Sequence, residues 1–98
     1  MKSEIEYHKE EEIRMVTKNM TIKIPTGLEA RPVAIFVQVA SRFESSIYVE
    51  VGTKRVNAKS IMGMMTLGLD LGEEVIVTAT GSDEEAAIAE IEKYLSSN

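Results

Sequence analysis

Two short segments of this sequence contain the side chains that could do chemistry. Residues 26–32 read TGLEARP, and the carboxylate of Glu29 comes just before a predicted helix. Residues 56–63 read VNAKSIMG, and the hydroxyl of Ser60 precedes a short predicted helix. A serine in that position is by default an N-cap that accepts a backbone hydrogen bond. Its hydroxyl can also accept a phosphoryl group at the positive end of the helix dipole. From these residues alone the cap is the default interpretation of Ser60, and the two roles can coexist.

The sequence predicts no catalytic residue, no metal site and no cofactor. It contains no cysteine, which excludes disulfides and thiolate ligands. Its only histidine, His8, lies in a charged N-terminal segment and is interpreted as a solvated residue. Glu29 is a poor phosphoryl acceptor, because a carboxylate forms a mixed anhydride, whereas imidazole is a neutral nucleophile with a second nitrogen to release its proton.

The first two predicted elements are a strand and a helix that flank Glu29. Residues 18–24 alternate apolar and polar side chains as a half-buried strand does, and Pro25 ends it. Residues 30–43 contain no glycine and repeat apolar residues at helical spacing. Ala34 and Val37 lie off that apolar stripe, so we expect the helix to show apolar surface beyond its core face.

The remaining elements predict an α+β fold. The sequence favours strands at 47–51, 55–57 and 74–80, a short helix within 60–67 and a final helix that starts near Ser82, which has capping-box spacing to Glu85. The order is βαββαβα. It predicts an open-faced sandwich, with a four-stranded antiparallel sheet and three helices on one face.

Charge and hydropathy exclude some classes of function. The net charge of −5 comes from the ends of the chain, since residues 15–81 hold seven basic and six acidic groups. No basic stripe is present to displace counterions, so direct binding to nucleic acid is not expected. No apolar run is long enough to span a bilayer, and we expect a cytoplasmic protein.

The two chemical segments and the distance between them resemble the HPr family of phosphocarrier proteins, from about Lys18 to the last helix. The resemblance implies the same open-faced sandwich. Members of this family carry a histidine at the position of Glu29, which takes a phosphoryl group from enzyme I of the sugar phosphotransferase system. Because Glu29 replaces that histidine, the resemblance implies that this chain is not a phosphocarrier.

Loss of that histidine together with retention of the serine motif resembles the Crh branch of the family, the catabolite repression HPr-like proteins of Gram-positive bacteria. This resemblance implies a regulator that is phosphorylated on Ser60 by HPr kinase/phosphorylase and then acts as corepressor of the transcription factor CcpA. It also implies a shared docking surface for these partners, and permits a homodimer formed by exchange of the first strand. The residues expected on the docking surface are Arg31, Ala34, Val37, Ile61, Met62 and Met65.

Other interpretations stay open at this point. A negative charge at Glu29 could imitate a phosphorylated histidine, although an acid is also favourable near a helix start. The domain could bind a metabolic enzyme or a transporter component without phosphorylation. Helical spacing separates the methionines of the short helix, with Met64 predicted inward and Met62 and Met65 outward.

Residues 1–14 form a charged extension before the HPr-like domain of residues 15–98. They are weakly patterned and have no counterpart in the family's sheet, so they could be a partner-binding arm or a helical spur. A third hypothesis is that translation starts at Met15. The codons for residues 9–11 can form a purine-rich ribosome-binding signal, and they end three codons before Met15.

Overall fold

Alternating burial along the strands builds one face of an antiparallel sheet. The computed structural model describes residues 5–10 and 13–97. In β5, Val75, Val77 and Ala79 are buried, as their period-two spacing predicts. The strands are β1 (Ile5–Glu10), β2 (Ile13–Thr21), β3 (Ser46–Val51), β4 (Lys54–Asn57) and β5 (Glu74–Thr80), and the helices are α1 (Ala30–Ser41), α2 (Ile61–Met65) and α3 (Glu84–Leu95).

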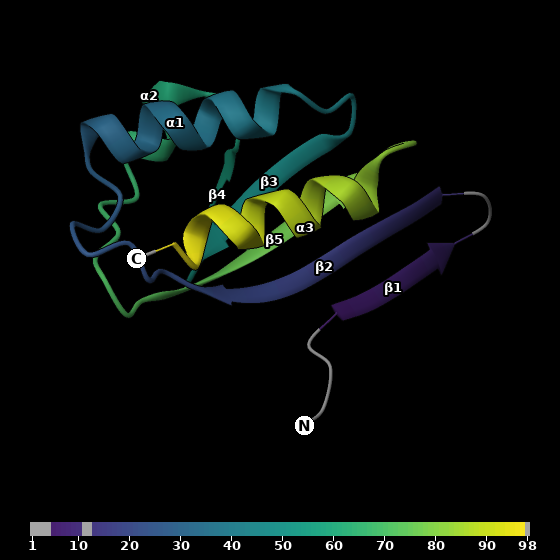
Figure 1. Ribbon diagram of the computed structural model, residues 1–98. Coiled ribbons are helices and arrows are strands. Elements are labelled where there is room, and N and C mark those ends of the chain that lie inside the picture. The colour runs from purple at the N-terminus through teal and green to yellow at the C-terminus, as the bar shows by residue number, and fades with distance from the viewer. Residues whose placement is uncertain (1–4, 11–12, 98) are drawn as a thin grey trace.

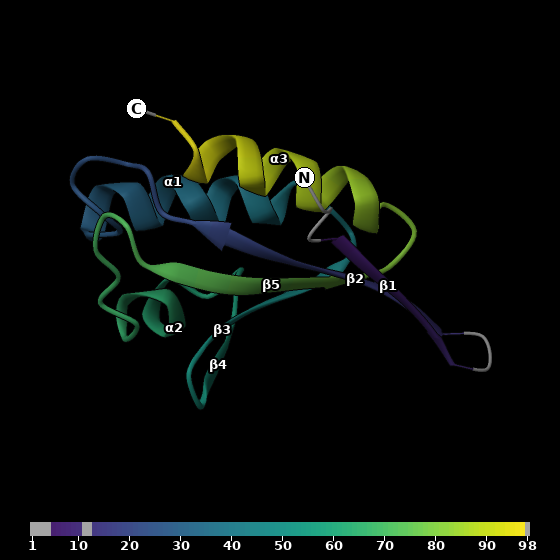
Figure 2. The same cartoon turned by 90° about the horizontal axis from the view of Figure 1, so that it is seen from below.

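The strand order is β1-β2-β5-β3-β4, and every neighbouring pair is antiparallel. Figure 1 shows the helices above the sheet, with α1 and α3 side by side. The view from below in Figure 2 shows the uncovered face of the sheet, with α2 near β4. Strands β2 to β5 and the three helices are the predicted open-faced sandwich, so the predicted fold class is confirmed.

The core lies between the sheet and the helices. Phe36 of α1, Ile91 of α3 and Ile47 of β3 are at most 1% exposed. An ion pair between Lys18 of β2 and Glu92 of α3 ties the second strand to the last helix. Among the residues whose burial is described, the core is continuous from Val16 of β2 to Leu95 of α3.

The N-terminal extension contains a strand that the sequence did not predict. β1 pairs along β2 from Ile5 opposite Lys18 to Glu10 opposite Ile13, which makes the sheet five-stranded. The prediction that the extension could be a helical spur is therefore wrong for its described residues, 5–10 and 13–14. The strand predicted at 18–24 is β2, and it is observed at 13–21. Its first residues pair with β1, so the strand begins earlier than predicted. The strand ends at Thr21, although one more backbone bond continues the register with β5, since Ile22 N–H donates to the carbonyl of Glu73 at 2.9 Å.

The first long helix is shorter than predicted. It ends at Ser41 and not at residue 43. The amides of Arg42 and Phe43 donate to carbonyls three residues back, at 3.2 and 3.3 Å, which is the tighter turn that commonly closes a helix. Phe43 still packs against the core from this turn.

The last helix begins at Glu84, with Asp83 as its N-cap residue in place of the predicted Ser82. The Asp83 carboxylate accepts hydrogen bonds from the Ser45 hydroxyl and from the amides of Ser45 and Glu44, at 3.0 and 2.9 Å. These bonds, led by that of the Ser45 hydroxyl, hold the pKa of Asp83 below its usual value. Asp83 thus joins the α1–β3 loop to the start of α3, a contact between distant residues that local spacing could not reveal.

Candidate functional site

Ser60 is the N-cap of α2. Its backbone is extended, with φ −107° and ψ 114°, and its hydroxyl oxygen accepts a hydrogen bond from the amide of Gly63 at 3.0 Å. The Ser60 carbonyl accepts from the Met64 amide, also at 3.0 Å. The side chain is partly exposed. The default structural role predicted for Ser60, the N-cap, is therefore confirmed at a partly exposed position.

The turn before Ser60 is held in place from both sides. The Asn57 side-chain oxygen accepts from the Lys59 amide at 2.8 Å, and the Lys59 ammonium group donates to the carbonyl of Phe43 at 2.6 Å. On the other side, a Cβ at Gly63 would lie 3.3 Å from the Ser60 hydroxyl oxygen and 3.3 Å from Cβ of Val56. Glycine therefore leaves room for the capping serine.

Three apolar side chains around Ser60 face solvent. Ile61 is 51% exposed, Met62 80% and Met65 47%. Met64, on the opposite side of the same helix, is 1% exposed and belongs to the core. The predicted division of these methionines is confirmed. The exposed set forms what we call the α2 patch, namely Ile61, Met62 and Met65.

The predicted surface on α1 is only partly present. Arg31 is exposed and Ala34 is partly buried. Val37, which was predicted to be exposed, is 8% exposed and packs in the core. The prediction for Val37 was wrong because α1 packs against both α2 and α3, so its buried face is wider than a single stripe.

Glu29 occupies the N-cap position of α1. Its carbonyl accepts from the Val33 amide at 2.8 Å, and its side chain makes no capping hydrogen bond. The side chain is exposed. The loop thus presents position 29 to solvent at the start of a twelve-residue helix.

The loop before Glu29 depends on one glycine. Gly27 has φ +69°, its amide donates to the Ile24 carbonyl at 2.8 Å, and Leu28 N–H donates to the Leu69 carbonyl at 2.8 Å. A Cβ at Gly27 would lie 2.7 Å from the Leu69 carbonyl oxygen and 2.9 Å from Cα of Asp70. Only glycine fits between the two loops in this conformation.

We expect Gly27→Ala to lower the free energy of unfolding by about 2–5 kcal/mol, since the left-handed backbone and the backbone overlap both act against it. Gly52→Ala is the matched control. Gly52 has φ +60° but nothing within 4 Å of its Cβ position, so only the backbone cost of about 1–2 kcal/mol applies. Urea unfolding of both variants measures the difference. Equal losses would show that the loop contact contributes nothing.

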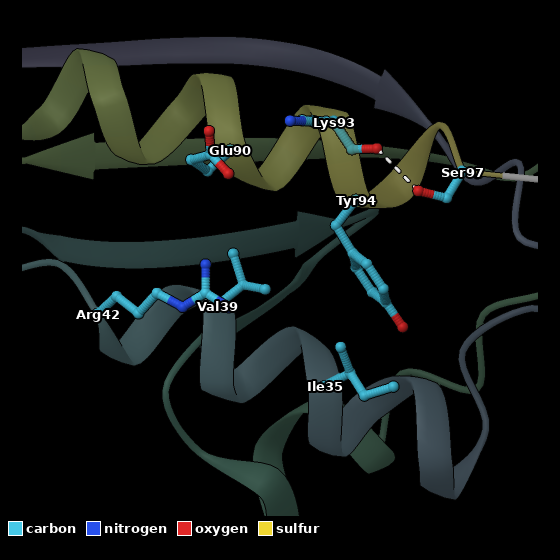
Figure 3. A pocket seen from close by; sticks show the side chains of 7 residues that line it. All are labelled: Ile35, Val39, Arg42, Glu90, Lys93, Tyr94 and Ser97. Atoms are coloured by element: carbon cyan, nitrogen blue, oxygen red, sulfur yellow. Dashed lines mark hydrogen bonds between the residues drawn. The ribbon is translucent and has the colours of Figure 1, made fainter.

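A groove between α1 and α3 was not anticipated. It has a volume of about 260 Å³, and the side chains of Ile35 and Val39 on α1 and Tyr94 on α3 lie along it (Figure 3). The Tyr94 hydroxyl donates to the Pro32 carbonyl at 3.1 Å, and burial raises the pKa of that hydroxyl. Ile35 is 40% exposed. Such a groove depends on how two helices pack, which no single segment of sequence specifies.

The residues at 5–10 and 13–97 contain no group of three or more histidine or acidic side chains placed to hold a metal ion. In the same part of the chain, no helix has the length and apolar character needed to cross a membrane.

Comparison with known proteins agrees with this fold. The family model described as the PTS HPr component phosphorylation site matches residues 16–97. The HPr-like protein Crh of Halalkalibacterium halodurans is 51% identical, over 81% of this chain and 99% of that protein. The crystal structure of the phosphocarrier protein HPr from Bacillus anthracis is 44% identical and superposes with a TM-score of 0.81, covering 83% of this chain and 96% of that one.

Crh of Bacillus subtilis, whose crystal structure is described as a domain-swapped, intertwined dimer, is 47% identical and superposes with a TM-score of 0.67, over 76% of this chain and 85% of that one. A match over nearly all of residues 15–98, at these identities, establishes common ancestry and fold. The chain belongs to the HPr family, and its relatives include proteins named Crh.

Proposed function

We propose that this protein is a non-catalytic, cytoplasmic regulator of carbon catabolite repression. In this proposal HPr kinase/phosphorylase phosphorylates Ser60, and the phosphorylated chain acts as corepressor of CcpA. The proposal is carried by two features that occur together in this chain. One is an exposed glutamate at position 29, and the other is the partly exposed Ser60 next to the exposed α2 patch. The first feature argues against phosphoryl transfer, and the second provides a place for modification and docking.

The Ser60 hydroxyl is suited to a regulatory phosphate. It is partly exposed, so a kinase can reach it after the bond to Gly63 N–H opens. A phosphate carries about −1.5 to −2 charges and three acceptor oxygens, and it would lie near the Gly63 amide that the hydroxyl caps now. Phosphorylation is thus expected to change the surface charge and leave the domain folded.

In this proposal the α2 patch supplies the apolar part of the CcpA surface, and Arg31 and Ala34 of α1, which packs against α2, contribute to the same surface. Methionine adapts its shape to different partners. Exposed apolar side chains stabilise a complex when they become buried. The phosphate would add charge-assisted hydrogen bonds to basic groups of the partner.

We expect Met62→Ala to weaken binding of the phosphorylated chain to CcpA by about 5- to 30-fold, because an interface methionine contributes about 1–2 kcal/mol. The free energy of unfolding of the Met62→Ala variant should differ from that of the unaltered chain by less than about 0.5 kcal/mol, since the Met62 side chain is 80% exposed. Met64→Ala is the matched control on the same helix. It should lower the free energy of unfolding by about 2–5 kcal/mol, because Met64 is 1% exposed. Unchanged CcpA affinity in Met62→Ala would remove the α2 patch from the interface.

Corepression is tested by the affinity of CcpA for operator DNA, measured by fluorescence anisotropy of labelled DNA. The kinase-treated chain should raise that affinity, whereas the untreated chain and kinase-treated Ser60→Ala should not. An equal effect of the untreated chain would contradict the requirement for phosphate.

An interaction module that works without phosphate is the second candidate. It is favoured by the α2 patch alone, which is exposed whether or not Ser60 is modified. In that case a metabolic enzyme or a transporter component would bind the chain and Ser60→Ala equally well. Capture of such a partner by both forms, together with no response of CcpA, would favour this candidate.

Self-association by exchange of a strand is a separate proposal, supported by the dimer described for the Bacillus subtilis relative. It does not enter the corepressor mechanism.

The start of the native chain is also a prediction. If translation begins at Met15, N-terminal mass spectrometry of the protein from its natural host will find no peptide from residues 1–14. Detection of those peptides would reject the later start, and any role of the extension in the native protein requires that result.

A further inference from the structure

The sheet has two edges, and they are protected in different ways. One edge is β4, which has only four residues and includes Lys54 and Arg55. A short strand with exposed charges is a poor template for another chain. The opposite edge of the four-stranded sandwich is β2, which has nine residues and carries core side chains at Val16 and Met20. A long strand of this kind needs cover.

That cover comes from the extension. β1 pairs with residues 13–18 of β2, while β5 pairs with residues 16–21 on the other side. Residues 16–18 therefore lie between two strands, and among the described strands residues 13–15 pair only with β1. Figure 1 shows β1 running alongside β2 at the edge of the sheet. Glu6, Lys9 and Glu10 are half of the six residues of β1, so the new outer strand is highly charged.

We propose that β1 is an intramolecular cap on the edge of β2, and that it keeps a second copy of this chain from pairing there. Only Glu11 and Glu12 separate the two strands in sequence. A partner segment tethered so closely has an effective concentration on the order of millimolar. At about 0.1 mM protein, a second copy is therefore outcompeted by about tenfold. The uncapped edge of β2 is the self-association surface, and its occupant is the edge of β2 from another copy.

The test disrupts β1 in the full chain. In an antiparallel ladder, successive residues direct their amides to opposite sides. The double variant Tyr7→Pro/His8→Pro therefore removes one amide that faces β2, whichever of the two it is. The core residues whose burial is described lie between Val16 and Leu95, so the domain should stay folded, which far-UV circular dichroism and urea unfolding will verify. Lys2→Pro/Ser3→Pro is the matched control, with two prolines placed before β1.

Sedimentation equilibrium at about 0.1 mM should give a mainly monomeric mass for the unaltered chain and for the control. The β1 variant should show a larger fraction of dimer, by up to about tenfold, since the tether no longer competes with a second copy. A β1 variant that stays monomeric would overturn the proposal. A full chain that dimerises as strongly as the variant would also overturn the proposed role of β1 as a cap. That result would still support the formation of a homodimer.

Amide hydrogen exchange of the unaltered chain provides a second measurement that does not depend on a variant. Residues 13–15 pair only with β1 among the described strands, so slow exchange at alternate amides there supports the cap. Exchange of all three at unstructured rates would overturn it.

Discussion

Glu29→His is expected to turn this chain into a phosphoryl acceptor for enzyme I with phosphoenolpyruvate, raising transfer by on the order of 10³-fold or more from a background at the detection limit. The reason is that the loop already has the form needed to present a nucleophile. Gly27 fixes the turn at φ +69°, position 29 is the exposed N-cap of α1, and Arg31 lies exposed in the first turn. Imidazole restores a neutral nucleophile where a carboxylate now stands.

Radiolabelled phosphoenolpyruvate and enzyme I measure the transfer. Glu29→Gln is the matched control, because it removes the charge without supplying a nucleophile, and it should stay unlabelled. An acid-labile phosphate on the unaltered chain would contradict the view that Glu29 ends the carrier function.

Phosphorylation of Ser60 is expected to tighten binding to CcpA by about 30-fold, which corresponds to about 2 kcal/mol from charge-assisted hydrogen bonds that reach the phosphate. Isothermal titration calorimetry with the phosphorylated and unmodified chains measures this gain. Raising the salt concentration should reduce it, because screening weakens the charged part of the contact and leaves the contribution of the α2 patch.

Met62→Ala in the phosphorylated chain separates the two parts. Its loss of affinity should persist at high salt, whereas the gain from phosphate should shrink. A gain from phosphate that does not respond to salt would contradict the charge-assisted contact.

Local sequence patterns predicted those parts of the fold that depend on neighbouring residues. Helical spacing alone separated Met64, now in the core, from Met62, now at 80% exposure. The serine before a short helix became the N-cap at Ser60. Each of these features is decided within a few residues, so periodicity and capping rules are enough.

Features that depend on distant contacts were missed or placed wrongly. Val37 is buried because α2 and α3 both pack against α1, which the pattern within the helix does not show. Asp83 became the N-cap of α3 while its carboxylate bound the loop at Ser45, far away in sequence. β1 was missed because its charged sequence lacks clear apolar alternation and its register is set by pairing with β2.

The candidate site needed both kinds of information. The motif around Ser60 and the glutamate at position 29 were visible in the sequence, whereas the ties that fix them were not. The Lys59 ammonium bonds to the Phe43 carbonyl, and the Gly27 loop rests against Leu69. These contacts come from the packing of separate elements and explain why two loops can present their side chains in fixed places.

The most direct test of the central claim is the intact mass of the chain after incubation with HPr kinase/phosphorylase and ATP. The account predicts the addition of one phosphate group, abolished by Ser60→Ala and retained by Ser82→Ala, which alters another exposed serine. An unmodified chain, in a reaction where the same kinase phosphorylates HPr, would contradict it. So would a phosphate that remains on Ser60→Ala.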